Sequence, residues 1–167
     1  MAGESGAGVR AARSLDGGIL FRRWLGCWID FVVAGVLVVL SGLPFVGAAP
    51  VSDGAAVAGL GLAVVAVIGY YTITEGLFGR TLGKLATGTI VVNAAGEPPG
   101  IWRALLRTLL RLVEVNPFLL GGIPAGIVVA LTANKQRLGD LAAGTYVVLV
   151  KKLESIGRTP AVAGVFD

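Results

Sequence analysis

Two long stretches without a charged side chain constrain the fold of this chain more than any other feature. Residues 31–52 and 54–74 contain no Asp, Glu, Lys or Arg. A helix needs about 20 apolar residues to cross the ~30 Å hydrocarbon core of a bilayer, so each stretch is long enough to span it once. We predict one membrane helix that begins around Leu20 and ends before Pro44. The second covers 54–74, and its far end carries two interfacial aromatic residues, Tyr70 and Tyr71.

The composition supports a membrane protein and excludes several kinds of catalytic site. Hydrophobic residues make up 55% of the chain and charged residues only 14%, whereas soluble domains contain about 25% charged residues. The chain has no histidine and a single cysteine, Cys27. Histidine-based catalytic arrangements, histidine-containing zinc sites and an intrachain disulfide are therefore excluded. We expect a protein that is not an enzyme and that holds no metal or other cofactor.

The region after the second stretch changes character several times. Residues 75–84 are basic and punctuated by glycine, and 88–92 (GTIVV) is rich in β-branched residues, which favours a short strand. Residues 101–115 follow a helical pattern in which three arginines, four apart, share one face. The next apolar run, 115–134, is interrupted by proline and by a glycine pair, so we do not expect one straight helix there. The three arginines are Arg103, Arg107 and Arg111.

One short sequence occurs twice. Residues 82–92 read LGKLATGTIVV and residues 138–148 read LGDLAAGTYVV, identical at 8 of 11 positions with an offset of 56. We predict that each copy is a turn leading into a short strand. The two strands would pair into a small sheet at the membrane surface, because an isolated strand leaves its backbone groups without partners. The third position holds Lys84 in one copy and Asp140 in the other, and these opposite charges predict an ion pair at the cytoplasmic face.

Basic residues gather in three groups, which predict the orientation in the membrane. By the positive-inside rule all three groups lie in the cytoplasm, so both termini are expected on the cytoplasmic side of the cell membrane. A single third crossing would place the last group outside. Residues 101–134 must therefore either cross twice or form a shallow helical hairpin, and the sequence leaves both arrangements open. The three groups are Arg10, Arg13, Arg22 and Arg23; Arg80, Lys84, Arg103, Arg107 and Arg111; and Lys135, Arg137, Lys151 and Lys152.

These observations predict an all-α membrane protein, a multi-pass helical bundle. It has two full transmembrane helices, a third hairpin-like apolar unit and two short strand-like segments at the cytoplasmic face. We expect a flexible tail over 1–18, a membrane domain over 19–150 and a second flexible tail over 151–167. The basic flanks favour anionic lipid headgroups, and no nucleic acid, as the partner. Two or three helices enclose little space, so a homo-oligomer or a membrane partner protein is also expected.

Charged residues inside the apolar segments are the candidate functional residues. Asp30 lies two helical turns after Arg23, on nearly the same face and about 10 Å deeper. An acid at that depth is costly unless it is paired or near water. Asp30 therefore forms a structural ion pair with an arginine of the 103/107/111 set, or exchanges a proton or cation, or reaches the surface.

Glu75, at the end of the second stretch, is another acid beside an apolar segment that needs a partner or water. It is either a surface acid beside a glycine turn or a second counter-charge for the arginines. The arginine face itself also has two interpretations. It either supplies these counter-charges or lies at the headgroups of the membrane interface.

Four segments in order resemble the RDD family of bacterial integral membrane proteins over about residues 19–150. They are Arg23 followed by Asp30, then GRTLGKLATGTIVV, RALLRTLLRLVE and KQRLGDLAAGTYVV. The family is named for one arginine and two aspartates, which match Arg23, Asp30 and Asp140. Gly26 stands where the family often has alanine. Gly139 stands where it commonly has histidine, which removes support for a proton relay through that histidine.

The resemblance implies a multi-pass inner-membrane protein of largely unknown activity that is suggested to act in transport. Some members are proposed to be cation/proton antiporters. We expect transport or an accessory role in it, with Arg23 and Asp30 as the coupled pair. The alternative is a non-transporting scaffold or assembly factor in which the same charges only hold the fold together.

Overall fold

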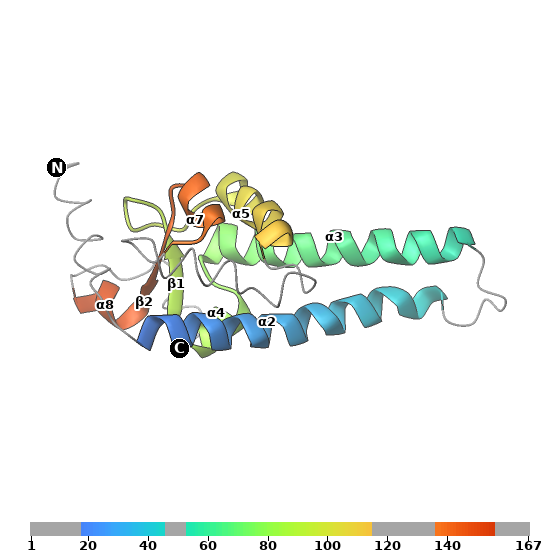
Figure 1. Ribbon diagram of the computed structural model, residues 1–167, viewed down its shortest axis with the longest axis horizontal. Helices are drawn as coiled ribbons and strands as arrows, with labels where there is room; N and C mark the ends of the chain where they lie inside the picture. Colours follow the sequence, from blue (N-terminus) through green and yellow to red (C-terminus); the bar gives the residue numbers. More distant parts are fainter. Residues whose placement is uncertain (1–17, 46–52, 115–135, 156–167) are drawn as a thin grey trace.

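Two long helices dominate the computed structural model, which describes residues 18–45, 53–114 and 136–155. Helix α2 (Gly18–Gly42) and helix α3 (Asp53–Phe78) run side by side in opposite directions (Figure 1). The short 3-10 helix η1 (Leu43–Phe45) extends α2. As predicted, α2 ends before Pro44, because proline cannot donate the backbone hydrogen bond that would continue it.

Both long helices meet the requirements for crossing a membrane by length and composition: 28 residues for Gly18–Phe45 and 26 for Asp53–Phe78. Most of their apolar side chains are exposed in the isolated chain. Val57 of α3, for example, exposes 70% of its surface. A soluble protein rarely exposes apolar surface of this extent, whereas a lipid-facing helix does so by necessity.

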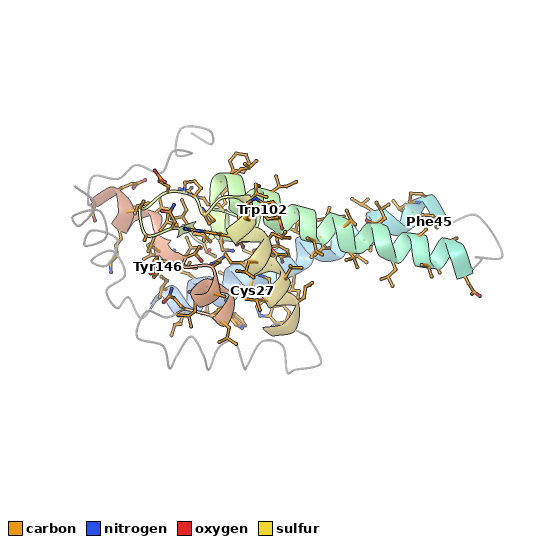
Figure 2. The ribbon with its side chains drawn as sticks, turned by 90° about the horizontal axis from the view of Figure 1, so that it is seen from above. Cys27, Phe45, Trp102 and Tyr146 are labelled. Atoms are coloured by element: carbon orange, nitrogen blue, oxygen red, sulfur yellow. The ribbon has the colours of Figure 1, made fainter. Side chains whose placement is uncertain are left out.

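The remaining elements gather around one end of the helix pair, where α2 begins and α3 ends (Figure 1). The other end of the pair, marked by Phe45 in Figure 2, projects away from them. The predicted amphipathic helix is present as α5 (Ile101–Glu114). The other elements are α4 (Leu82–Ala86), β1 (Thr89–Val92), α7 (Leu138–Ala142), β2 (Tyr146–Leu149) and α8 (Val150–Ser155).

The two copies of the repeated sequence have the same local structure. Each is a five-residue helix, a glycine and a strand, and β1 pairs with β2 in antiparallel register. The intervening glycines, Gly88 and Gly144, have φ of +66° and +60°, a left-handed conformation that favours glycine. The predicted pairing of the two strands is therefore confirmed. Its position on the cytoplasmic side remains a prediction.

The segment after β2 differs from the prediction. Residues 151–155 were expected to begin a flexible tail, but they belong to α8. Leu153 of α8 is fully buried in a small apolar core with Ile90, Val92 and Val148. The burial of Leu153 and the hydrogen bond from Val150 N to Gly88 O at 3.0 Å hold this turn of helix against the strand pair.

Two expectations concern residues that the structure does not describe. The interrupted apolar run 115–134 lies outside the described residues, so its two arrangements remain open predictions. The same holds for the expected tails over 1–17 and 156–167. Within the described ranges the protein is mostly helical and contains two candidate membrane-spanning helices.

Candidate functional site

Glu75, near the end of α3, is fully buried and is bound by three basic side chains. Its carboxylate accepts hydrogen bonds from Lys84 Nζ at 2.7 Å, Arg107 Nε at 3.0 Å and Arg111 Nη2 at 2.5 Å. The interpretation of Glu75 as a surface acid is therefore wrong. Charge-assisted hydrogen bonds from three cations keep this carboxylate ionised.

Asp140 of α7 is the second acid that is bound by arginines. Its carboxylate accepts from Arg23 Nη2 at 2.8 Å and from the backbone nitrogen of Arg137 at 3.2 Å, and it contacts Arg107 Nη1. Burial alone would raise the pKa of Asp140, but the charges of Arg107 and Arg23 outweigh burial and hold that pKa well below its usual range. Arg107 thus connects both acids and ties α5 to α3 and α7.

The predicted ion pair between Lys84 and Asp140 is wrong. Lys84 binds Glu75, whereas Asp140 binds arginines. Burial lowers the pKa of Lys84 to about 8, although Glu75 opposes this shift, so its ammonium group remains largely protonated at pH 7. The repeated helices carrying Lys84 and Asp140 pack on different partners, α4 on α2 and α7 on α5, so equivalent positions do not face each other.

Asp30, on α2, is also buried, but it is bound by neutral donors, whereas Glu75 and Asp140 are bound by cations. Its carboxylate accepts hydrogen bonds from three neutral donors: Tyr70 Oη at 3.0 Å, Thr81 Oγ1 at 2.6 Å and the backbone nitrogen of Gly83 at 2.9 Å. Within the described ranges no basic side chain lies within ion-pair distance of Asp30. The predicted pairing of Asp30 with the arginines of α5 is therefore wrong.

The position of α4 explains why Asp30 binds backbone instead of arginine. A Cβ atom added to Gly83 would lie only 2.0 Å from the carbonyl oxygen of Gly26 on α2. Only glycine allows α4 to approach α2 this closely, and the approach carries the Gly83 amide to Asp30. Thr81 is the N-cap of α4: its hydroxyl accepts from Lys84 N and donates to Asp30.

The predicted candidate residues do not form a single cluster of mutual contacts. Arg23 and Asp30 share a face of α2 but bind different elements, α7 and α4. Arg103 is exposed and belongs to no ion pair in the described part of the chain. Arg107 and Arg111 point into the protein, so the interpretation that the arginine face of α5 lies at the headgroups is wrong for these two residues.

Three contacts of the site could not be anticipated from the patterns used above. Tyr70 binds Asp30 through its hydroxyl, and the guanidinium of Arg111 lies over the Tyr71 ring, 4.1 Å from its centroid. Thr145 contacts Arg107 through its hydroxyl. The one available signal was Thr81, because threonine directly before a short helical segment is a typical N-cap.

A cavity of about 320 Å³ lies beside Asp30. Its lining includes Cys27, which Figure 2 labels in the crowded half of the molecule. Its walls come from α2, α3, α4, α5 and the strand pair, and Asp30 is the only acid among the described residues that line it. A carboxylate has about four lone-pair sites, of which Asp30 uses three. The arrangement therefore leaves one acceptor site on a buried carboxylate at the edge of a cavity.

A metal centre is not apparent in the part of the chain that the structure describes. No group of three or more Cys, Asp or Glu side chains in those ranges is placed to hold a metal ion.

Comparison with known proteins identifies the family. Residues 18–144 match the profile of the RDD family. No curated protein and no solved structure matches the chain. The matched region contains both membrane-length helices and every ion pair described above. The chain therefore belongs to the RDD family of membrane proteins.

Proposed function

We propose that this RDD protein takes part in transport across the bacterial inner membrane and that Asp30 exchanges a proton or a small cation. The observation that carries this proposal is the contrast among Asp30, Glu75 and Asp140, the acids that are buried in the described part of the chain. Glu75 and Asp140 are each bound by at least two cations, whereas Asp30 has only neutral donors and lines a cavity.

The contrast favours Asp30, because the exchanging residue must take up a proton or cation without losing the hydrogen bonds that hold the surrounding side chains in place. Protonating Glu75 or Asp140 would break several charge-assisted hydrogen bonds and leave basic side chains buried without a counter-charge. Asp30 can accept a proton on its remaining acceptor site while its three hydrogen bonds stay in place. We therefore assign the exchange step to Asp30 and a structural role to the other two acids.

A pathway through the membrane needs more than the two described spans. Two helices enclose too little space for an aqueous route, so we propose that a second copy or a membrane partner protein completes it. The positive-inside distribution of basic residues supports an orientation with both termini in the cytoplasm.

Sealed vesicles that contain the purified protein test this proposal. The wild-type protein should dissipate an imposed proton or sodium gradient, and Asp30→Asn should abolish the effect while the thermal unfolding temperature stays near the wild-type value. Asp53→Asn is the matched control, because Asp53 is an exposed acid at the opposite end of α3. Asp53→Asn should transport normally. Gradient dissipation by Asp30→Asn at the wild-type rate would contradict the assignment.

A second candidate function, a non-transporting scaffold, is favoured by the ion pairs themselves. Arg23, Lys84, Arg107 and Arg111 tie α2, α4 and α5 to the acids of α3 and α7. Under this proposal the wild-type protein leaves every gradient intact, and Asp30→Asn lowers yield and thermal stability. The same two measurements therefore separate the candidates.

A further inference from the structure

We propose that the cavity beside Asp30 binds the phosphate headgroup of an anionic phospholipid, with the start of an acyl chain lying toward Ala34 and Val67. The site is the cavity that the proposed exchange at Asp30 also uses, but this inference is tested by lipid binding alone, so its failure and a failure of transport are distinguishable. It rests on the charge of the cavity wall, on the direction in which the wall changes polarity and on the cavity volume.

The cluster of charged side chains around the cavity contains an excess of positive charge. Among the described residues it holds three acids, Asp30, Glu75 and Asp140, and five cations, of which all but Arg137 expose at most 14% of their side chains. Four of the cations line the cavity, but only one of the acids does. Cations held away from water without full compensation favour an anion beside them. The cavity-lining cations are Arg23, Lys84, Arg111 and Arg137, and the fifth cation of the cluster is Arg107.

Arg137 is the cation most open to a ligand. It lines the cavity, its side chain is partly exposed, and it belongs to no ion pair with a described carboxylate. Arg23, Lys84 and Arg111 already bind Asp140 or Glu75. A phosphate group would therefore gain its principal contact from Arg137, whose planar guanidinium suits two phosphate oxygens at once.

Both long helices change from polar to apolar along the cavity in the same direction. On α2 the wall passes from Arg23 and Asp30 to Ala34, which lies about 6 Å further along the helix than Asp30. On α3 it passes from Tyr71 to Val67. This direction leads away from the short elements and along the apolar length of the helix pair. A phospholipid bound with its phosphate among the cations would place its acyl chain in that direction.

The volume and the apolar wall favour a lipid over a soluble anion. A cavity of about 320 Å³ is at the lower end of the range for small-molecule sites, about 300–1,000 Å³. It holds a phosphate and the first carbons of one chain, and the rest of the lipid would remain in the bilayer. Free phosphate would leave the apolar part of the wall without a partner.

The test measures lipid retained by the detergent-purified full chain, by native mass spectrometry, with phosphatidylglycerol or phosphatidylcholine added. The wild-type protein should retain one phosphatidylglycerol in preference to phosphatidylcholine. Arg137→Gln should weaken retention about tenfold, as expected for one lost charge-assisted hydrogen bond. Arg103→Gln removes an exposed arginine outside the cavity and should retain lipid normally. Equal loss in both variants would overturn the proposal in favour of general attraction to headgroups.

A second variant keeps every charge and fills the apolar end. Ala34→Phe should reduce phosphatidylglycerol retention, whereas Ala58→Phe, at an exposed position of α3 that does not line the cavity, should not. If Arg137→Gln fails to fold, this pair decides the question. Inorganic phosphate is the competing ligand: if it displaces phosphatidylglycerol at millimolar concentration, the site is one for a soluble anion and the lipid assignment is wrong.

Discussion

Arg107 is the residue on which the buried ion pairs depend most. Its guanidinium donates from Nε to Glu75 and contacts Asp140 and Thr145 through Nη1. The fixed fork of a guanidinium reaches two acids at different angles, which a single ammonium group does not. The loss of Arg107 would therefore weaken the links from α5 to both α3 and α7.

We predict that Arg107→Leu lowers the free energy of unfolding by about 3–5 kcal/mol, because it leaves two buried carboxylates with fewer counter-charges. Arg107→Lys should restore only part of this loss. Thermal unfolding in detergent measures both variants. Arg103→Leu, on the exposed side of the same helix, should stay within about 0.5 kcal/mol of wild type. Equal effects at the two positions would mean that Arg107 stabilises α5 only through helix propensity.

The depressed pKa of Asp140 gives a pH dependence with a definite sign. A carboxyl group whose pKa is lower in the folded state stabilises the fold above its unfolded pKa, here 3.8, and this stabilisation is lost as pH falls toward the folded value. We expect the unfolding temperature of the wild type to fall between about pH 5 and pH 3. Asp140→Asn should be less stable at pH 7 and should lose less over the same interval. A parallel decline in both proteins would show that Asp140 does not contribute.

For single residues, the sequence identified the members of the candidate site more successfully than the contacts that they make. Asp30, Glu75 and Asp140 stand out because an acid near an apolar segment is costly. Their partners depend on contacts between distant parts of the chain. Asp30, for example, accepts a hydrogen bond from the backbone amide of Gly83, 53 residues away. Every residue except proline has such an amide, so the positions of charged residues in the sequence do not indicate this donor.

The repeated helix–glycine–strand element shows how one local structure serves two different environments. α4 and α7 have matching backbone hydrogen bonds: Leu85 N donates to Thr81 O at 2.8 Å and Leu141 N donates to Arg137 O at 3.0 Å. Yet α4 packs against α2 and α7 against α5. Local structure follows from the shared sequence, and packing follows from the surroundings.

This difference predicts opposite outcomes for the same substitution at equivalent positions. Gly83→Ala places a methyl group about 2.0 Å from the Gly26 carbonyl oxygen and 2.8 Å from Asp30 Cγ, so α4 must move away from α2. In Gly139→Ala the nearest atom is the Arg107 carbonyl oxygen at 3.4 Å, an ordinary contact. Gly83→Ala should prevent recovery of folded protein. Gly139→Ala should fold normally or gain up to about 1 kcal/mol of helix propensity.

Expression followed by gel filtration in detergent distinguishes these outcomes. A monodisperse Gly83→Ala protein with wild-type thermal stability would mean that α4 does not approach α2 as closely as described.

The elements themselves were largely predictable because their signals are local. Apolar length gives α2 and α3, the spacing of three arginines gives α5, and repetition gives the two strands. α4 and α7 were predicted only as turns, because five residues are too short for a helical pattern. α8 was missed, because its six residues include two lysines and its position depends on contacts with the strand pair, among them the burial of Leu153.

Over the described part of the molecule the long helices and α5 expose apolar side chains, whereas Glu75, Asp140 and the basic residues that bind them are largely buried. α5 illustrates this arrangement: Trp102 exposes 81% of its surface and Leu109 and Leu112 are also exposed, whereas Arg107 is buried. An amphipathic helix in a soluble protein has the reverse arrangement. The outer face of α5 therefore requires an apolar environment, which a bilayer provides.

We predict that Trp102 contacts acyl chains. Replacing the other two tryptophans, Trp24 and Trp28, by phenylalanine leaves Trp102 as the only tryptophan. Its fluorescence in reconstituted vesicles should be quenched by lipids brominated on the acyl chain and protected from aqueous iodide. Quenching by iodide alone would place this face of α5 in water and would require a protein partner to cover it.

The contact between Arg23 and Asp140 joins positions 117 residues apart in the chain. Since a chain is synthesised from its N-terminus, both long helices leave the ribosome before Asp140 exists. The ion pair between Arg23 and Asp140 therefore cannot form until most of the chain has been synthesised. A product truncated upstream of Asp140 cannot join the start of α2 to α7, so this link across the fold forms only late in synthesis.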